Sequence, residues 1–456
     1  MNNATQIVLL GGGYASIWAY RSLIKELHHE MLFGEVRIIV ICPDDYHFFH
    51  GWTAESLTGI VQDRNRMSPL AELLSKALLI KGYANEINCE DNLVYVKTET
   101  GTTNSIHFDH LLIGIGAYDC EQIDGIMRAG YQVKSHAAFL HTKKNIQLAV
   151  AKAAQLRRED AEKLLRFTIC GGGFSGIEMA ANIAEFLTIL TKQYSSLENV
   201  KPTIRLVHSK ETVLDGLNPR FEKIRAYTEK VLGQYGIEMI NNKKVTKITT
   251  EGAFLSDNSC LESSMVISTI GQSRICLKGT EGWRRDGINR LCTNSFLQIQ
   301  GYQNIWGGGD ACSVPYRKTK NPCIPNALWA IKHGEYAGKN IARTIRQESL
   351  KSFDYKGLGQ CASLGIGKGM GELYGFQFTG WIAWITRWLF FNYFMPSRKV
   401  MIKEIADWMY LLFFGRRKGL KIQEQFFTFN RSLNPILQPG EKPTLQIENL
   451  NSQVKI

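Results

Sequence analysis

Two glycine clusters with the same spacing are able to hold the pyrophosphate of a dinucleotide. They are Gly11-Gly-Gly13-Tyr-Ala-Ser16 and Gly171-Gly-Gly173-Phe-Ser-Gly176. The first glycine of each would make a tight turn after a strand, and Gly13 or Gly173 would let a pyrophosphate approach the backbone. The last position needs a small residue so that the next helix can pack closely, and Ser16 takes this place in the first cluster. The anion would then meet the free N–H groups of a helix N-terminus.

The elements that must position these clusters are repeated as well. Each cluster follows a short β-branched run and precedes a stretch with helical spacing, and each helix is followed by a second strand. We expect strands at 7–10, 36–41, 167–170 and 203–207, with helices ending near 27 and 190. A single GxGxxG pattern is weak, but two copies in the same strand–helix context favour two βαβ units. Alternating strands and helices predict parallel sheets in an α/β fold.

Three later segments read as strands that end in glycine. Residues 108–117 end in a turn that contains Gly116, and residues 264–271 repeat the pattern up to Gly271. Residues 304–310 lead into Gly-Gly-Gly-Asp310. Two dinucleotide sites in one chain indicate that one nucleotide passes electrons to the other.

Composition sets wider bounds. The chain has 456 residues and a net charge of +12, which favours an anionic partner. No nucleic-acid motif accompanies that charge, so we expect no nucleic-acid partner. None of the ten Cys forms a CxxC pair, so we predict reduced thiols and no metal site. The N-terminus shows no signal or transit peptide, and no apolar run reaches 18 residues.

The order of these motifs, from residue 5 to about 345, resembles the two-dinucleotide-binding-domain flavoproteins. The resemblance implies an α/β fold with two Rossmann-like domains, the second inserted in the first. It places FAD in residues 1–145 and 292–345 and NAD(P)H in residues 146–291. It also implies that Asp310 contacts the ribityl chain of the flavin.

Within that group, the chain looks like the type II (non-proton-pumping) NADH dehydrogenases. The segments that carry this resemblance are Tyr46-His-Phe-Phe49, Phe174-Ser-Gly-Ile-Glu178 and the course of residues 353–384. It implies electron transfer from NADH or NADPH through FAD to a membrane quinone, with Glu178 near the nicotinamide. Two alternatives stay open. One is a sulfide:quinone reductase-like enzyme that uses Cys120, Cys312, Cys323 and Cys361. The other is a membrane-associated flavin- and nucleotide-binding sensor with weak turnover.

Four positions depart from the family pattern. Cys42 and His208 stand where an acid would bind an adenosine ribose, so we count both as cofactor-binding positions. A His followed by Ser209 and Lys210 would not repel a 2′-phosphate, which leaves NADH and NADPH open. Leu328 and Lys332 replace two glutamines near the flavin and the quinone. We predict the acceptor site at Leu328, Trp329 and Lys332, and name Glu178 and Lys332 as catalytic residues.

The C-terminal region, residues 346–433, is predicted to attach to a membrane. Residues 380–395 are apolar but reach only about 24 Å, short of a bilayer core of about 30 Å. In residues 398–414, we expect Met401, Ile405, Trp408 and Leu412 to form an apolar face, with Lys399, Lys403, Glu404 and Asp407 opposite.

Residues 380–421 also hold half of the net charge and four of the nine Trp. We therefore expect a peripheral protein on an anionic membrane surface, at the cytoplasmic face of the cell membrane. The predicted membrane residues are Trp381, Trp384, Trp388, Arg398, Lys399, Trp408, Arg416 and Arg417. A core-packed or dimer-forming helix pair is the alternative, and a homodimer stays open. We expect part of the polar tail, 434–456, to be mobile.

Overall fold

The first glycine cluster follows the central strand of the first parallel sheet. A computed structural model describes residues 4–217, 219–317 and 321–415. Its five-stranded sheet has the order β18-β9-β1-β2-β5, all parallel. The strands are β1 (Thr5–Leu10), β2 (Val36–Cys42), β5 (Leu78–Lys81), β9 (His110–Ile113) and β18 (Ile305–Gly307). The buried runs Ile7–Leu10 and Ile38–Cys42 fill its centre, as expected of a sheet covered on both faces.

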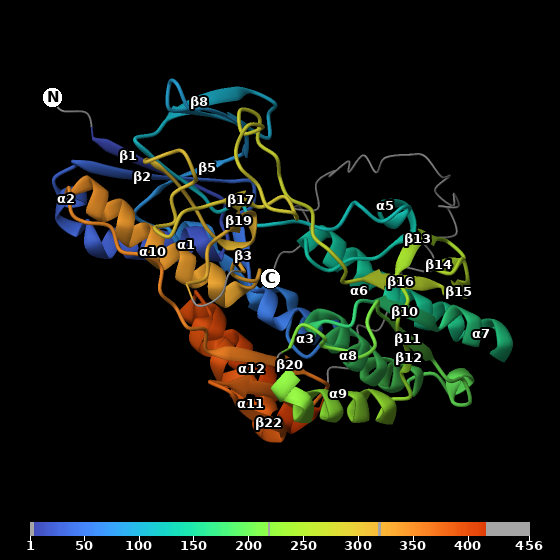
Figure 1. The fold of residues 1–456 in the computed structure, drawn as a ribbon. Helices are drawn as coiled ribbons and strands as arrows, with labels where there is room; N and C mark the ends of the chain where they lie inside the picture. The colour runs from blue at the N-terminus through green and yellow to red at the C-terminus, as the bar shows by residue number, and fades with distance from the viewer. Residues whose placement is uncertain (1–3, 218, 318–320, 416–456) are drawn as a thin grey trace, which may run out of the picture. The chain divides into compact units, whose positions relative to one another are not determined.

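Two helices pack against each other beside this sheet. They are α1 (Tyr14–Glu26) and α10 (Ala327–Ile345), which run side by side in Figure 1. A Cβ on Gly334 of α10 would lie 2.2 Å from the Ala15 carbonyl oxygen. Only glycine allows the helices to come this close, and this approach sets α10 against the start of α1.

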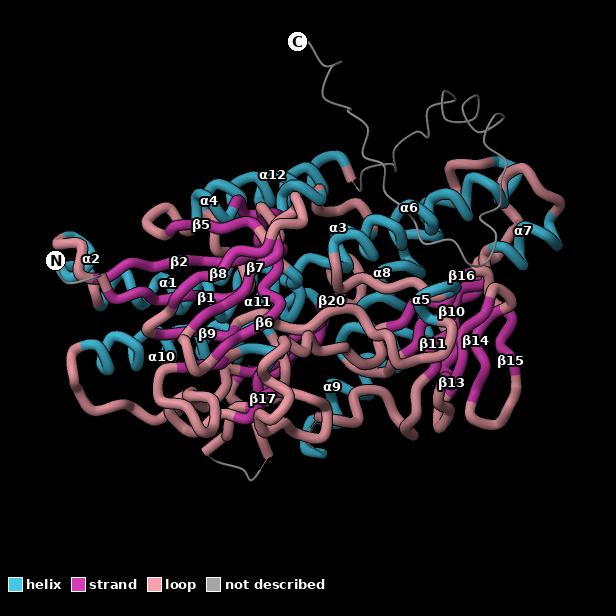
Figure 2. The backbone as a smooth tube through the Cα atoms, turned by 90° about the horizontal axis from the view of Figure 1, so that it is seen from above, coloured by secondary structure: helices cyan, strands magenta, loops and turns pink. Residues whose placement is uncertain are grey.

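The second parallel sheet surrounds the second cluster. It has the order β12-β11-β10-β16, with β10 (Arg166–Cys170), β11 (Thr203–Val207), β12 (Glu238–Ile240) and β16 (Met265–Ser268), and α8 (Phe174–Thr191) follows β10. Figure 2 shows the strands in separate groups. All four strands come between β9 and β18 in the sequence, so the second unit is inserted in the first. The predicted α/β fold class is confirmed; the domain boundaries stay predictions.

Three three-stranded antiparallel sheets were not predicted. They are β6-β7-β8 (Tyr83–Asn88, Leu93–Lys97, Thr103–His107), β13-β14-β15 (Val245–Thr249, Gly252–Leu255, Cys260–Glu262) and β20-β21-β22 (Gly359–Ser363, Gly369–Leu373, Phe376–Gly380). The remaining elements are α2 (His28–Leu32), β3 (Tyr46–Phe48), η1 (His50–Trp52), α3 (Thr53–Leu57), η2 (Asp63–Arg66), β4 (Met67–Pro69), α4 (Leu70–Leu73), α5 (Ile126–Ala129), α6 (His136–Ala153), α7 (Arg158–Leu164), η3 (Ser195–Leu197), η4 (Pro219–Phe221), α9 (Glu222–Gln234), β17 (Leu291–Cys292), η5 (Gly309–Ala311) and β19 (Cys312–Ser313).

A helical hairpin ends the described chain. Its helices are α11 (Trp381–Phe394) and α12 (Arg398–Phe414), close to the predicted limits. Ser397 caps α12 by accepting a hydrogen bond from the Val400 N–H. Among the described residues, no helix combines the length and apolar character needed to cross a bilayer.

The predicted faces of α12 were wrong for the two acids, although Lys399 and Lys403 are exposed as predicted. Glu404 and Asp407, expected to point outward, are 0% and 2% exposed, and Trp408 is also buried, against Trp52 and Trp384. Asp407 accepts hydrogen bonds from Gln62 and Asn65. Spacing along the helix cannot reveal that another part of the chain supplies partners for these acids.

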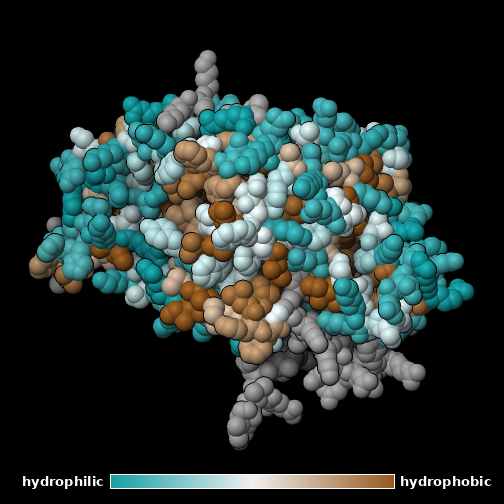
Figure 3. Space-filling view, turned by 90° about the horizontal axis from the view of Figure 1, so that it is seen from below, coloured by the Kyte–Doolittle hydropathy of each residue, from teal (hydrophilic) through white to brown (hydrophobic). Residues whose placement is uncertain are grey.

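The outward face of the hairpin is apolar instead. Brown side chains gather on part of the surface seen in Figure 3. The exposed apolar residues of the hairpin include Trp381, Ile382, Leu389, Tyr393, Ile402, Met409, Leu412, Phe413 and Phe414. Of the predicted membrane residues, Trp381, Arg398 and Lys399 are exposed, and Trp384 and Trp388 are half-buried. Arg416, Arg417 and the predicted tail lie outside the described residues.

The burial of Glu404 predicts a pH-dependent stability. Burial raises the pKa of this carboxyl from 4.5 to about 8, and the charges of Glu55 and Asp407 add to the increase. The protonated Glu404 carboxyl therefore contributes fully to the free energy of unfolding below pH 4.5, and this contribution is lost as the pH rises from 4.5 through about 8. In that window, wild type should lose about 1.4 kcal/mol of unfolding free energy per pH unit relative to Glu404→Gln. Urea unfolding at pH 6 and pH 8.5 measures the difference, and parallel pH profiles would contradict it.

Candidate functional site

The turn between β1 and α1 has the geometry of a phosphate cradle. Gly11 has φ +94°, and a Cβ there would lie 2.7 Å from the Gly114 carbonyl oxygen. Gly13 is the N-cap of α1, and the nearest atom to its missing Cβ is the Gly114 carbonyl oxygen at 3.8 Å, so no protein atom crowds this position. The Ser16 hydroxyl donates to the Leu10 carbonyl oxygen at 3.0 Å. This bond to the strand explains how serine replaces the third glycine.

The turn between β10 and α8 repeats that geometry. Gly171 has φ +116°, and a Cβ on Gly176 would lie only 1.7 Å from the Gly171 carbonyl oxygen. No heavy atom lies within 4 Å of a Cβ built on Gly173, which is the N-cap of α8. The position beside Gly173 is therefore open at the N-terminus of α8, where a pyrophosphate would bind.

Two further predicted glycines follow the strand ends. Gly116 has φ +67° and lies three residues after β9, and Gly271 has φ +70° and lies three residues after β16. A Cβ on Gly271 would lie 3.3 Å from the Cys120 sulfur. At both positions the backbone turns in a conformation that glycine adopts readily. Their contact with cofactor stays a prediction.

Asp310 is held by side chains that the sequence did not single out. Its carboxylate pairs with Lys134 at 3.1 Å, and Arg274 donates to its carbonyl oxygen at 2.8 Å. The neighbouring Gly309 N–H donates to His333 Nδ1 at 3.2 Å. Burial lowers the pKa of His333 to about 3, so the ring stays neutral and accepts this bond. The Gly-Asp turn is thereby fixed beside the β1–α1 cradle.

A buried cation marks the first cradle as a ligand site. Arg66 is 1% exposed, and its Nε and Nη2 atoms have no hydrogen-bond partner among the described residues. Its guanidinium lies 3.9 Å from the centre of the Phe139 ring, and Tyr14 and Asp63 interact with its charge. Burial lowers its pKa to about 10, which still leaves it charged at neutral pH. A buried guanidinium with open N–H groups needs acceptors, and FAD offers phosphate and carbonyl oxygens, so these residues fit FAD.

Neither strand end presents a carboxylate at the ribose position. Cys42 is buried at the end of β2, and burial raises its thiol pKa to about 11. His208 is buried under Gly172, and burial lowers its pKa. The next cation, Lys210, lies 3.6 Å from Asp215, with both side chains exposed. The structure therefore leaves the predicted ambiguity between NADH and NADPH in place.

Glu178 is part of a buried cluster that joins α8 to the hairpin. Arg387 of α11, 2% exposed, lies 3.0 Å from Glu178 and 2.6 Å from Glu55, and also donates to the Gly51 carbonyl oxygen. Glu178 accepts the Ser363 N–H at 2.8 Å. Burial raises the pKa of Glu178 to about 7, and Arg387 opposes that increase. Burial alone would lower the pKa of Arg387, but the two carboxylates raise it, so the guanidinium stays protonated.

The predicted acceptor residues lie together at the start of α10. Asn326 caps the helix by accepting from the Trp329 N–H at 2.9 Å, and the Trp329 ring packs edge-on against Tyr316 and Tyr355. Lys332 pairs with Glu335 at 2.8 Å. Leu328 is half-buried. Glu335 therefore offsets the charge of Lys332, whose catalytic role stays a prediction.

Comparison with known proteins agrees with this geometry. Residues 5–334 match the model of the pyridine nucleotide-disulphide oxidoreductases, which is most of the chain. The chain belongs to the pyridine nucleotide-disulphide oxidoreductase family. Type II NADH:quinone oxidoreductases of Staphylococcus epidermidis and Staphylococcus aureus are each 24% identical over 391 residues, 82% of this chain and 91% of the relative.

Two solved structures share the fold. NDH2 from Plasmodium falciparum, solved with NADH, has a TM-score of 0.79 at 16% identity and covers 90% of this chain and 99% of that one. The sulfide:quinone oxidoreductase of Aquifex aeolicus has a TM-score of 0.67 at 18% identity and covers 90% and 96%. Both likenesses show the fold.

Three of the four cysteines named for the sulfide-oxidising alternative are poor nucleophiles. All ten are unpaired thiols. Burial raises the pKa of Cys312, Cys323 and Cys361 to about 12 each, whereas a reactive cysteine needs a lowered pKa. This environment argues against the sulfide-oxidising alternative.

Proposed function

We propose that the protein is an FAD-dependent NAD(P)H:quinone oxidoreductase that transfers two electrons to a membrane quinone without pumping protons. The observation that carries the proposal is the pair of open cradles at Gly13 and Gly173, each at a helix N-terminus beside a parallel sheet. The similarity to type II NADH:quinone oxidoreductases over 82% of the chain supports it.

FAD and the nucleotide donor are each assigned to one helix N-terminus. The N-terminus of α1 binds the FAD pyrophosphate, with Arg66 and the Lys134–Asp310 pair beside it, in residues 1–145 and 292–345. The N-terminus of α8 binds the donor pyrophosphate in residues 146–291. The chemistry that bound FAD supplies is hydride acceptance from a nicotinamide and release of two electrons to a quinone. Glu178, anchored by Arg387 and Ser363, orients the nicotinamide end of the donor.

The quinone approaches through the hairpin side, by Phe376 and Trp381, toward Leu328, Trp329 and Lys332. Phe376 and Trp381 are exposed apolar side chains next to the apolar outward face of the hairpin. We place this face on the anionic cytoplasmic surface of the cell membrane. If a second copy covers it instead, the protein will run as a dimer in detergent-free solution and will not bind vesicles.

Steady-state oxidation of NADH and NADPH with a soluble quinone tests the proposal. FAD-replete protein should show quinone-dependent turnover with at least one donor. Tight donor binding with no turnover would support the sensor alternative and overturn the enzyme. Sulfide oxidation that is lost when Cys361 is replaced would support the sulfide reaction.

The donor preference is expected to depend on position 208. In His208→Glu, a carboxylate would accept the ribose 2′-hydroxyl of NADH and repel a 2′-phosphate, so kcat/KM for NADPH should fall at least about tenfold relative to NADH. Asp215→Asn is the matched control, because it releases Lys210 without changing the strand end and should favour NADPH. An unchanged ratio in both variants would contradict the assignment.

A further inference from the structure

A groove between η2 and α12 carries two cations that form no ion pair with any described residue. Its volume is about 410 Å³. The side chains that the argument uses are Gln62, Arg64, Asn65, Lys403 and Asp407. Arg64 and Lys403 are exposed, and neither forms an ion pair within the part of the chain that the structure describes.

Two cations near the groove, unlike Arg64 and Lys403, are already paired with acids. Lys399, one turn before Lys403, pairs with Glu72 at 3.1 Å. Lys143 pairs with Asp63, the residue before Arg64, at 2.6 Å. The positive charge of the groove therefore comes from Arg64 and Lys403.

The acid on the groove wall is occupied by other donors. Asp407 accepts hydrogen bonds from the Gln62 N–H at 2.8 Å, the Gln62 side chain at 2.9 Å and the Asn65 side chain at 2.7 Å, and is 2% exposed. These bonds hold α12 against η2, the two elements that supply Lys403 and Arg64 to the groove. The groove therefore has two exposed cations and one carboxylate that is already hydrogen-bonded, a charge balance that favours an anion.

The groove borders the apolar face of the hairpin. At about 100° per residue, Ile402, Met409 and Phe413 fall within about 20° of one line along α12, and Lys403 lies about 100° round the helix from that apolar stripe. All three apolar side chains are exposed. This is the order of chemistry along a phospholipid, with an anionic headgroup next to hydrocarbon.

We propose that the groove binds the phosphate of an anionic phospholipid headgroup while the acyl chains lie along Ile402, Met409 and Phe413. The inference deepens the membrane attachment proposed above and rests on it. The continuous apolar stripe favours a lipid over a free phosphate ion.

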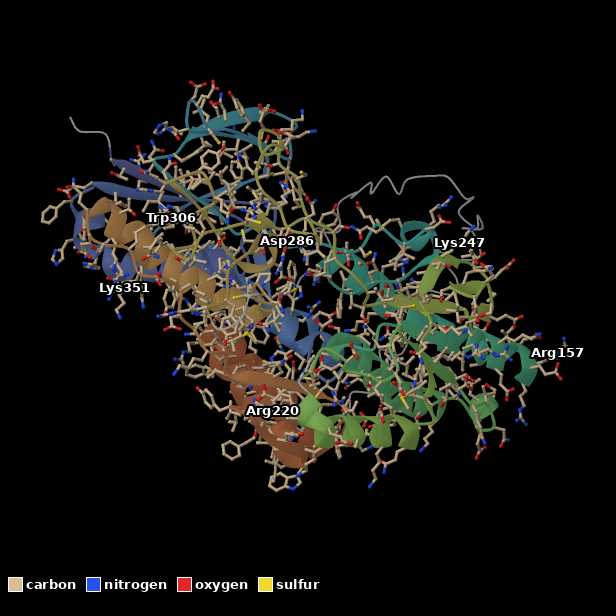
Figure 4. All side chains as sticks on the ribbon, viewed as in Figure 1. Arg157, Arg220, Lys247, Asp286, Trp306 and Lys351 are labelled. Atoms are coloured by element: carbon tan, nitrogen blue, oxygen red, sulfur yellow. The ribbon has the colours of Figure 1, made fainter. Side chains whose placement is uncertain are left out.

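The test uses the full chain with FAD bound and three double variants of equal charge loss. R64Q/K403Q removes the cations of the groove. R398Q/K399Q removes two cations of α12 outside the groove. R157Q/K247Q removes exposed cations far from the hairpin, as Figure 4 shows. Monomeric dihexanoylphosphatidylglycerol and inorganic phosphate are titrated by calorimetry, and vesicles of phosphatidylcholine with and without phosphatidylglycerol are used for co-sedimentation.

Wild type, R398Q/K399Q and R157Q/K247Q should bind the monomeric lipid with similar affinity, and R64Q/K403Q should not saturate. On phosphatidylglycerol vesicles, R64Q/K403Q should bind about 25-fold more weakly than wild type, because each cation near an anionic surface contributes about fivefold. Soluble quinone turnover should not change.

Three outcomes would overturn the inference. They are monomeric-lipid binding by R64Q/K403Q equal to wild type, an equal loss of monomeric-lipid binding in R398Q/K399Q, and inorganic phosphate binding as tight as that of the monomeric lipid. Failure of wild type to bind either vesicle would instead remove the proposed membrane attachment, and the monomer titration would still judge the groove.

Discussion

Replacing Arg387 with methionine is expected to cost about 3–5 kcal/mol of unfolding free energy, because it leaves Glu55 and Glu178 buried without a counter-charge. Methionine keeps most of the volume, so the loss is electrostatic rather than a cavity. Urea unfolding measures it. The same change should lower donor oxidation, because Arg387 holds Glu178 at the start of α8.

The controls for Arg387 separate its charge from its geometry. Arg387→Lys keeps the charge but cannot bridge both carboxylates in the same way, so it should fall between wild type and Arg387→Met. Lys399→Met breaks the exposed pair with Glu72 and should cost less than about 1 kcal/mol. Adding Glu55→Gln to Arg387→Met should recover part of the loss. Equal stability of Arg387→Met and Lys399→Met would show that the buried cluster is unimportant.

The pH dependence gives a readout that general destabilisation would not move. Arg387 lowers the pKa of Glu178, and burial holds that pKa at about 7. Without the guanidinium, the pKa should rise further, so the pH profile of donor KM should shift to higher pH in folded Arg387→Met. An unshifted profile would mean that Glu178 does not contact the donor site.

Replacing Gly173 with alanine should raise the donor KM at least about tenfold, which corresponds to about 1.4 kcal/mol of binding. The new Cβ meets no protein atom within 4 Å, so it would occupy the space of the pyrophosphate and little else. Unfolding free energy should stay within about 1 kcal/mol of wild type, and the flavin absorbance should be unchanged. Donor titration of flavin absorbance measures the effect.

Two glycine controls make this prediction specific. Gly13→Ala is the matched change at the first cradle, and it should reduce FAD retention without a comparable effect on donor KM. Gly176→Ala puts a Cβ 1.7 Å from the Gly171 carbonyl oxygen, so it should cost about 3 kcal/mol or more through backbone displacement. Normal donor binding by Gly173→Ala would remove α8 as the donor site.

The local parts of this fold were predictable. Strand β11 and helix α12 have the predicted limits, and both βαβ units are present. Each rests on signals within about 20 residues, such as β-branched runs, helical spacing and turn glycines. The small antiparallel sheets escaped because their strands are short and half-exposed, with few apolar residues in alternation.

The contacts that complete the site were not predictable in the same way. Arg387 reads as an interruption of an apolar helix, and nothing near it in sequence announces Glu55, 332 residues earlier. Lys134 reaches Asp310 across 176 residues, and Arg66 carries no motif. Pairs of this kind depend on how distant segments meet, which a single sequence does not display.

By itself, the sequence determined the two glycine cradles and the elements around them, because backbone sterics and hydrophobic spacing act over neighbouring residues. Only the tertiary structure decided which residues of α12 are buried and that Arg387 pairs with Glu178. It also decided that Arg64 and Lys403 line one groove. Burying an acid or a guanidinium is favourable only when the segment packed against it supplies a hydrogen-bonding or oppositely charged partner, and the fold brings that partner into place.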